Sequence, residues 1–250
     1  MNPAALRAPW FLALARRYVR RKLAHDLDGL RAAGIDRARE AAAAGPVILA
    51  ANHVSWWDPF LVVALDEALG TEGYALMDAA NLAGLPFFAR LGAIPLDRGN
   101  PARLRAGLRA GAALLDRPGR ALWMFPQGRL RPAHLRPLGI QPGIGLLARL
   151  APGAAVVPIA FQYAFGEHPA PAALAWLGEP IPHRIAATPE GTTLLEIALE
   201  AGLREIDAAL AGDAPPLPVL VPSRQRRPDE GVGSRMLGRW RAGEPGGHRG

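Results

Sequence analysis

The stretch that most constrains this chain is a strand-like run followed by a polar turn and a helix-like run. Residues 46–51 are apolar, residues 52–58 are polar and aromatic, and residues 60–69 are again mostly apolar. A residue before proline is disfavoured in the α region, so we expect Asp58 at the N-cap of the helix and Pro59 as its first residue. The turn is thereby predicted at the carboxyl end of a strand, where open α/β sheets bind ligands.

Two side chains of this turn, His53 and Asp58, are candidates for a catalytic pair. Residues five apart lie about 140° from each other on a regular helix, so these side chains would meet only across a compact loop. In such a loop the carboxylate accepts a hydrogen bond from one imidazole nitrogen, and the other nitrogen takes a proton from a substrate. The alternative is plain turn chemistry, since Asp-Pro can open a helix and Asn-His can form a turn without any catalytic role.

The whole pattern resembles a known motif. Asn52, His53, Ser55 and Asp58 match, residue for residue, the first motif of the glycerolipid acyltransferase superfamily, which includes the lysophosphatidate and glycerol-3-phosphate acyltransferases. The resemblance implies that His53 is the general base, that Asp58 orients it, and that Asn52 and Ser55 belong to the substrate site. It covers roughly residues 46–160.

A second motif of that family ends in an arginine that helps to bind the phosphate of the acceptor. Arg98 follows the strand-like run 93–96 and fits this place. An arginine fork suits phosphate oxygens, so the resemblance implies a phosphate-binding role for Arg98. The alternative is a surface arginine in a Gly-Asn turn.

Residues 125–131 resemble the third motif of the family, usually written Phe-Pro-Glu-Gly-Thr-Arg, but depart from it. Gln127 stands for the acidic residue, Arg129 for the threonine and Leu130 for the arginine, and Arg129 or Arg131 could supply the missing cation. Gln127 can hydrogen-bond a hydroxyl but carries no charge. The acceptor therefore stays open between lysophosphatidate or another glycerolipid and a non-phosphate alcohol, such as a glycolipid or a terpenoid hydroxyl. The predicted substrate-binding residues are Asn52, Ser55, Arg98, Phe125, Pro126, Gln127, Gly128, Arg129 and Arg131.

The rest of the chain alternates between strand-like and helix-like runs. We expect one α/β domain over residues 38–212, with a mixed, largely parallel sheet flanked by helices. Residues 38–45 are expected to be an alanine-rich connector, and residues 81–92 either a core helix or a wall for an acyl chain. Residues 157–160 resemble the fourth motif of the family. The expected strands are 73–77, 93–96, 120–125, 154–161 and 174–181, and the expected helices are 101–116, 142–150 and 192–210.

The N-terminal segment, residues 1–37, is predicted to contain an amphipathic helix over residues 4–34. Trp10, Leu14 and Tyr18 recur at one-turn spacing, and the first 22 residues carry six basic residues and no acidic ones. This combination suits an anionic bilayer, so we expect peripheral, monotopic association with the cytoplasmic face of the cell membrane. The apolar run is too short to span a bilayer, and a signal peptide fits poorly. The alternative is a helix packed on the domain's own core.

Cysteine is absent, which excludes disulfides and thiolate metal sites, and the other histidines show no ligand spacing, so no metal site is expected. Residues 213–250 are rich in Pro, Arg and Gly and are predicted to be mostly a flexible tail, with residues 219–221 packing locally. The arginines of the tail could touch nucleic acid or anionic lipid. The folded part lacks the aromatic and basic interleaving of a nucleic-acid surface, so such a partner is not expected.

The resemblance implies an O-acyltransferase of phospholipid biosynthesis. Its donor would be an acyl thioester on coenzyme A or acyl carrier protein, and no cofactor is required. The changes at residues 127, 129 and 130 motivate an alternative, a non-catalytic lipid-binding protein of the same fold. A serine hydrolase is not expected, because the sequence has no Gly-x-Ser-x-Gly elbow.

Overall fold

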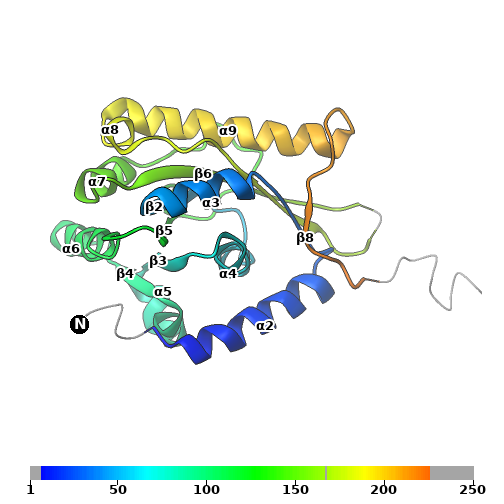
Figure 1. The fold of residues 1–250 in the computed structure, drawn as a ribbon, viewed down its shortest axis with the longest axis horizontal. Coiled ribbons are helices and arrows are strands. Elements are labelled where there is room, and N and C mark those ends of the chain that lie inside the picture. The colour runs from blue at the N-terminus through cyan, green and yellow to red at the C-terminus, as the bar shows by residue number, and fades with distance from the viewer. Residues whose placement is uncertain (1–6, 167, 226–250) are drawn as a thin grey trace, which may run out of the picture.

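The computed structural model describes residues 7–166 and 168–225 (Figure 1). In this part of the chain, eight strands form one sheet in the order β4-β3-β5-β2-β6-β7-β1-β8. The elements in chain order are α2 (Pro9–His25), β1 (Leu30–Ala33), α3 (Ile35–Ala44), β2 (Val47–Ala51), α4 (Asp58–Leu69), β3 (Glu72–Asp78), α5 (Ala79–Gly84), the 3-10 helix η1 (Pro86–Leu91), β4 (Ala93–Leu96), α6 (Pro101–Ala112), β5 (Arg120–Met124), α7 (Gly143–Leu150), β6 (Ala155–Ala164), β7 (Ala172–Leu177), α8 (His183–Ala186), α9 (Pro189–Ala211) and β8 (Val219–Val221).

The sheet is mixed and largely parallel. Strand β2 pairs in parallel with β5 on one side and with β6 on the other. Parallel pairs also join β3 to β5, β3 to β4 and β1 to β7, whereas β6–β7 and β1–β8 are antiparallel. The predicted fold class is therefore confirmed. Strand β1 comes from the segment 1–37 and β8 from the segment 213–250, so both terminal segments contribute a strand to the sheet.

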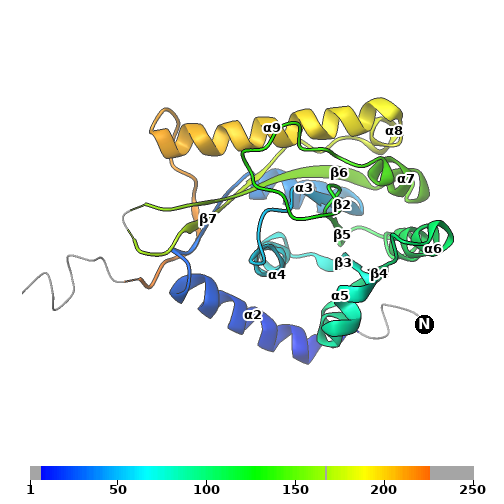
Figure 2. The same cartoon turned by 180° about the vertical axis from the view of Figure 1, so that it is seen from behind.

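Helices cover both faces of the sheet (Figures 1 and 2). Apolar side chains of α2, α3 and α4 pack against one face, and those of α6, α7 and α9 pack against the other. All five residues of β2 are buried, as is typical of a parallel strand covered on both faces. The loop that follows β2 therefore starts from a rigid position in the centre of the sheet.

The expectation of a helix over residues 4–34 is wrong at its C-terminal end. Helix α2 ends at His25, and the chain enters the sheet as β1, in which Leu30 and Ala32 are buried. Residues 38–45 are not a connector, because residues 35–44 form α3. Alanine is the best helix former, and Ala38 and Ala42 pack in the core, so composition and packing both favour the helix.

The stretch 81–92 is not a core helix. It forms the end of α5 and the 3-10 helix η1, and neither element contains a buried residue. It lies on the surface beside α2, where the N–H of Ala8 donates to the C=O of Arg90 over 3.0 Å. The second interpretation, a wall for an acyl chain, stays a prediction.

The local packing expected for residues 219–221 is confirmed, because they form β8 and pair with β1. Residues 226–250, the larger part of the predicted flexible tail, lie outside the described residues, as do residues 1–6.

Helix α2 packs on the domain with only part of its surface. Val19, Leu23 and Ala24 are buried against α4, β1 and their neighbours. The opposite stripe stays exposed, at 64% for Trp10, 59% for Leu14 and 57% for Tyr18. Within residues 7–166 and 168–225, no helix is long and apolar enough to cross a membrane. The helix thus combines domain packing with an exposed aromatic and apolar stripe.

A partly buried carboxyl, that of Asp66, lies between α4 and the sheet. One oxygen of Asp66 accepts hydrogen bonds from Trp123 Nε1 over 2.9 Å and from Thr71 Oγ1 over 2.8 Å. Burial raises the pKa of Asp66 to about 6, although these hydrogen bonds and the charges of Arg7 and Arg16 favour the ionised form. At neutral pH, ionised Asp66 therefore lowers the free energy of unfolding.

Replacing Asp66 by Asn is expected to remove part of the pH dependence of stability. A carboxyl whose folded pKa is raised from 3.8 to about 6 stabilises the fold while protonated, and this contribution is lost as the pH rises through about 6. From this group alone, the free energy of unfolding of the wild type should fall by about 1–3 kcal/mol between about pH 4 and pH 7. Urea unfolding of both proteins over this range measures the difference.

Asp36→Asn is the matched control, because this exposed carboxylate pairs with Arg39 on the surface of α3. It should keep the pH dependence of the wild type. An unchanged pH dependence in Asp66→Asn would contradict the raised pKa.

Candidate active site

The loop after β2 is fastened to β6 by a buried amide. Asn52 is 0% exposed, its Nδ2 donates to Phe161 O over 3.0 Å, and its Oδ1 accepts from Phe161 N over 2.7 Å. This pair of bonds extends the contact between β2 and β6 past the last paired residue, Ala51. The amide of Asn52 thus holds the start of the loop, and its side chain is not presented at the surface.

The structure brings His53 and Asp58 together across this loop. His53 Nδ1 lies 2.6 Å from Asp58 Oδ2, and the same oxygen accepts from Val54 N over 2.8 Å and from Ser55 N over 3.1 Å. The other oxygen, Oδ1, accepts from the hydroxyl of Tyr163 over 2.8 Å. A fully buried carboxylate is thereby bonded to four donors.

Asp58 is the first residue of α4 and not its N-cap, so that expectation is wrong. The N-cap is Trp57, whose backbone is already helical and whose side chain makes no capping bond. The Asp58 carboxylate reaches back to the donors of residues 53–55 and does not cap the N–H groups ahead of it. His53 Nδ1, Val54 N and Ser55 N all donate to Oδ2 of Asp58. These three donors precede Asp58 in the chain and take the place of the helix N–H groups that an N-cap side chain would bond.

The His53 ring is held on a second side by an aromatic contact. It stacks on Phe125 with 4.3 Å between ring centroids and 29° between planes. The side chain of His53 is 25% exposed, whereas that of Asp58 is 0% exposed. With Nδ1 engaged by Asp58, Nε2 is the ring nitrogen left to exchange a proton with a bound molecule.

The backbone of His53 is held by the loop 125–131. Gln127 is 5% exposed, its Oε1 accepts from His53 N over 2.7 Å, and its Nε2 donates to Leu138 O over 2.9 Å. Arg131 N donates to His53 O over 2.8 Å. Both ends of the Gln127 amide are thus used by the backbone, and a glutamate could accept from His53 but could not donate to Leu138.

Arg98 also reaches this loop. Its Nη1 donates to Gly128 O, and its Nη2 lies 3.2 Å from Asp78 Oδ2 at the start of α5. Gly128 has φ 68°, and a Cβ there would meet the Arg98 guanidinium, so glycine suits both the turn and the contact. The arginine side chain is 50% exposed and leaves part of its fork open to a ligand.

The remaining predicted residues differ in how they lie. Ser55 Oγ accepts from Trp57 N over 3.1 Å within the turn, and Pro126 is buried. Arg129 is exposed, and the guanidinium of Arg131 lies against Gly139, whose φ of 75° excludes most side chains. The structure thus gathers His53, Asp58, Phe125, Gln127, Gly128 and Arg98, while the guanidinium of Arg131 is directed to Gly139.

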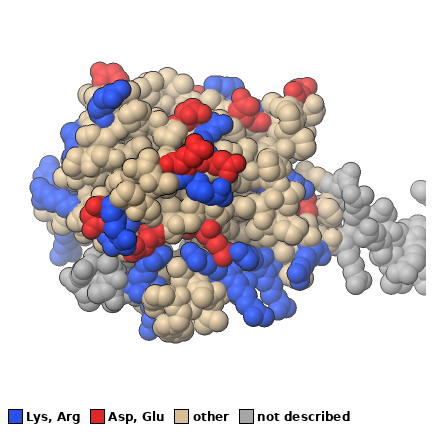
Figure 3. Space-filling model, viewed as in Figure 1, with Lys and Arg blue, Asp and Glu red and all other residues tan. Residues whose placement is uncertain are grey.

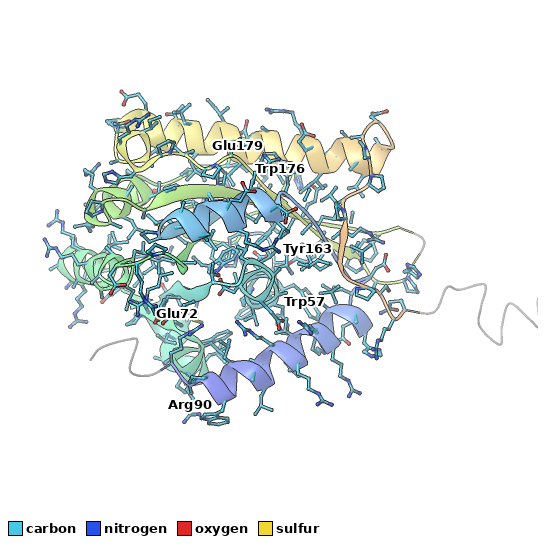
Figure 4. All side chains as sticks on the ribbon, in the orientation of Figure 1. Trp57, Glu72, Arg90, Tyr163, Trp176 and Glu179 are labelled. Atoms are coloured by element: carbon cyan, nitrogen blue, oxygen red, sulfur yellow. The ribbon has the colours of Figure 1, made fainter. Side chains whose placement is uncertain are left out.

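Sequence reasoning missed one residue of this site. Tyr163, labelled in Figure 4, comes from β6. Its hydroxyl donates to Asp58, 105 positions earlier in the chain. The only signal in the sequence was its place shortly after residues 157–160, which resemble the fourth motif. The pairing of β6 with β2 decides which side chain of that strand meets the loop.

Two hollows lie on either side of α2. One is an apolar cavity of ≈ 440 Å³ that borders the turn 56–59 and η1. The other is a basic groove of ≈ 1140 Å³ with five arginines between α2, α4 and β8. Figure 3 shows Lys and Arg gathered along the lower edge of the molecule, where α2 runs. The apolar cavity is lined by Phe11, Leu14, Ala15, Tyr18, Val19, Trp56, Pro59, Phe60, Val63, Leu85, Phe87, Phe88 and Leu91.

Among the described residues, no group of three or more His, Asp or Glu side chains is placed to hold a metal ion.

Comparisons with known proteins agree with this architecture. A family model described as Acyltransferase matches residues 31–162, a span that includes the loop after β2 and the 125–131 loop. The chain is similar in structure to the 1-acyl-sn-glycerophosphate (LPA) acyltransferase PlsC from Thermotoga maritima. The TM-score is 0.58 at 16% sequence identity, and the match covers 79% of this chain and 80% of that chain. Curated protein sequences contain no match.

Replacing Gln127 by Glu is expected to destabilise the protein. The carboxylate would face Leu138 O without a proton to donate, so a buried carbonyl would lose its partner. The free energy of unfolding should fall by about 1–3 kcal/mol, as measured by urea unfolding at neutral pH.

Gln141→Glu provides the control for this change. Its exposed amide also donates to a backbone carbonyl, that of Gly139, over 3.1 Å. Water can replace that bond, so stability should change by less than about 0.5 kcal/mol. A Gln127→Glu protein as stable as the wild type would show that the amide is not required.

Proposed function

The chain belongs to the acyltransferase family, and we propose that it is an O-acyltransferase in which His53 is the general base and Asp58 orients it. The observation that carries the proposal is the 2.6 Å contact between His53 Nδ1 and the buried Asp58 carboxylate. Glycerolipid synthesis is the setting favoured by the family and by the fold shared with PlsC.

The proposed reaction joins a fatty acyl group to a lipid hydroxyl. His53 Nε2 takes the hydroxyl proton while the oxygen attacks the thioester carbonyl, so that a C–O bond forms and the C–S bond breaks. The imidazolium, stabilised by Asp58, returns its proton to the departing thiolate. The products are an ester and a free thiol, and no covalent enzyme intermediate is needed. A positioned base of this kind contributes about 10²–10⁴-fold to the rate.

For the acceptor, we propose lysophosphatidate or another glycerolipid. Arg98 supports this choice, because its guanidinium lies at Gly128 beside the loop that holds His53 and is half exposed. Leu130 stands where the family has a second arginine and is 44% exposed without a charge. This single change favours, as the second candidate, an alcohol without phosphate, such as a glycolipid or a terpenoid. A purely lipid-binding role is not proposed, because the His53–Asp58 pair is complete.

We propose an acyl thioester of coenzyme A or acyl carrier protein as donor, with its chain in the apolar cavity. This cavity is bordered by Trp56 and Pro59, which lie before and after Asp58 in the chain. Phe87 and Phe88 of η1 stack with 4.4 Å between centroids and form part of the opposite wall. An apolar lining without charged side chains suits a fatty chain.

We further propose that α2 rests on the cytoplasmic face of an anionic membrane. The exposed Trp10, Leu14 and Tyr18 would enter the interface, while Arg17 and Arg21 in the basic groove would face lipid phosphates. Such placement would bring the apolar cavity, which shares Leu14 and Tyr18, next to the layer that contains both lipid substrates.

Replacing His53 by Ala is expected to abolish acyl transfer. Purified protein is mixed with long-chain acyl-CoA and an acceptor, and thiol release is followed. The rate should fall by about 10²-fold or more, because no other group takes the hydroxyl proton. The acceptors are lysophosphatidate, glycerol-3-phosphate, a lysophospholipid, a glycolipid and a hydroxylated isoprenoid, and acyl carrier protein replaces coenzyme A in a parallel series.

His183→Ala is the control for the loss of a histidine. Residue 183 begins α8, just after Ile181, which pairs with Val156 near the amino end of β6, whereas the site lies beyond the carboxyl end of β2. It should keep the wild-type rate. Activity of His53→Ala near that of the wild type would refute the assignment of the base. If the wild type transfers no acyl group with either donor to any acceptor, the proposed acyltransferase activity is refuted.

Replacing Trp10, Leu14 and Tyr18 together by Ser is expected to weaken membrane binding at least about tenfold, because three large side chains no longer enter the interface. Sedimentation with vesicles of phosphatidylcholine and phosphatidylglycerol measures the bound fraction. The control replaces Leu194, Ile197 and Leu210 of α9, which are also exposed but lie on the other face of the sheet.

The electrostatic part is tested with the double variant Arg17→Glu and Arg21→Glu. Its binding should fall for vesicles with phosphatidylglycerol, since each basic residue near an anionic surface contributes about 1 kcal/mol. The effect should shrink at about 1 M salt, which shortens the screening length to about 3 Å. Equal binding of all variants would refute the orientation proposed for α2.

A further inference from the structure

Tyr163 lies on the strand that also holds the start of the active-site loop. It follows Phe161 by two positions in β6, and Phe161 exchanges two hydrogen bonds with the amide of Asn52. The same strand thus holds the loop at Asn52 and presents the Tyr163 hydroxyl to Asp58.

The two oxygens of the Asp58 carboxylate are bonded differently. Oδ2 is shared by three donors, His53 Nδ1 at 2.6 Å, Val54 N at 2.8 Å and Ser55 N at 3.1 Å. Oδ1 accepts from Tyr163 at 2.8 Å. The bond to Oδ1 adds a second point of attachment, which restrains the carboxylate against rotation about its Cβ–Cγ bond. The plane of the carboxylate matters because it sets the direction along which His53 is held.

From this arrangement we propose that Tyr163 is a positioning residue of the acyl-transfer site, acting on His53 through the orientation of the Asp58 carboxylate. The proposal rests on the proposed function, in which His53 is the base. Tyr163 itself touches neither the hydroxyl nor the thioester in this scheme.

Toward Asp58, the hydroxyl of Tyr163 acts as a donor. Burial, together with the charge of Asp58, raises the pKa of Tyr163 far above its ordinary value of 10.0. The hydroxyl therefore keeps its proton wherever His53 can act as a base, and the direction of its bond to Oδ1 does not reverse with pH.

The alternative is that the Tyr163 hydroxyl only provides a hydrogen bond to a buried carboxylate and has no effect on His53. A second tyrosine bonded to a carboxylate, outside the proposed site, serves as a control that distinguishes the two roles. Tyr74 donates to Glu72 Oε1 over 2.6 Å, and Glu72 is also bonded to Arg117 and Arg120. Burial, with the neighbouring Glu72, raises the pKa of Tyr74 to about 12. This second tyrosine and carboxylate lie at the amino end of β3, where Glu72 faces Arg120 in the sheet.

The experiment compares Tyr163→Phe with Tyr74→Phe in the full chain. Each change removes one hydroxyl bonded to a carboxylate, so both should lower the melting temperature by similar amounts. Tyr163→Phe should lower kcat about tenfold with KM changed less than twofold, while Tyr74→Phe should leave kcat within about twofold of the wild type. Equal effects of both variants on kcat would overturn the proposal.

A second measurement does not depend on the reaction. The ¹⁵N shifts of the His53 ring, assigned by their loss in His53→Ala, report how Nδ1 is bonded to Asp58. They should move in Tyr163→Phe and stay in Tyr74→Phe, and unchanged shifts in Tyr163→Phe would overturn the proposal. If the wild type transfers no acyl group to any acceptor, the proposed function fails, whereas the ring shifts still decide whether Tyr163 positions His53.

Discussion

The buried carboxylate of Asp58 is the group on which the site depends. A carboxylate removed from water is costly unless donors replace the lost solvent. Its four donors come from the turn 53–55 and from Tyr163, and they meet only when the loop closes over the start of α4. The loop is therefore folded around the anion. The same requirement explains why Asp58 lies inside the first turn of α4 and why its side chain points back along the chain.

The sheet supplies the fixed frame that this loop needs. Strand β2 is buried along its length between its parallel neighbours β5 and β6. A residue within β6 and a residue just after β5 both hold the loop that follows β2. On the β6 side that group is Phe161, bonded to Asn52, and on the β5 side it is Gln127, bonded to His53 and Leu138. The glutamine that departs from the third motif is thus part of the frame. Leu130 is the departure on which the second proposed acceptor class rests.

Helix α2 connects the domain to the surfaces proposed for lipid. Its buried side carries Val19 and Leu23, while Trp10 and Tyr18 remain exposed, and Tyr18 lines the apolar cavity. The arginines on its other flank gather in the basic groove, where Arg20 alone among them pairs with Glu67 at 2.8 Å in the described part of the chain. One helix therefore separates the apolar cavity, which borders the turn 56–59, from the basic groove. Such a division suits a protein that takes its substrates from a bilayer.

The sequence by itself determined the strand, turn and helix around residues 46–69, the meeting of His53 with Asp58, and the mixed, largely parallel sheet. The strand, turn and helix follow from local signals, since apolar runs and a proline at the helix start act over a few positions. The pairing of His53 with Asp58 was implied by the resemblance to the first acyltransferase motif. Only the tertiary structure decided that β1 and β8 complete the sheet, that both ends of the Gln127 amide bond to the backbone, and that Tyr163 is the second partner of Asp58. Each of these depends on which strands lie side by side and in which register. That choice is made by burial of the whole core and leaves no mark in the residues on either side.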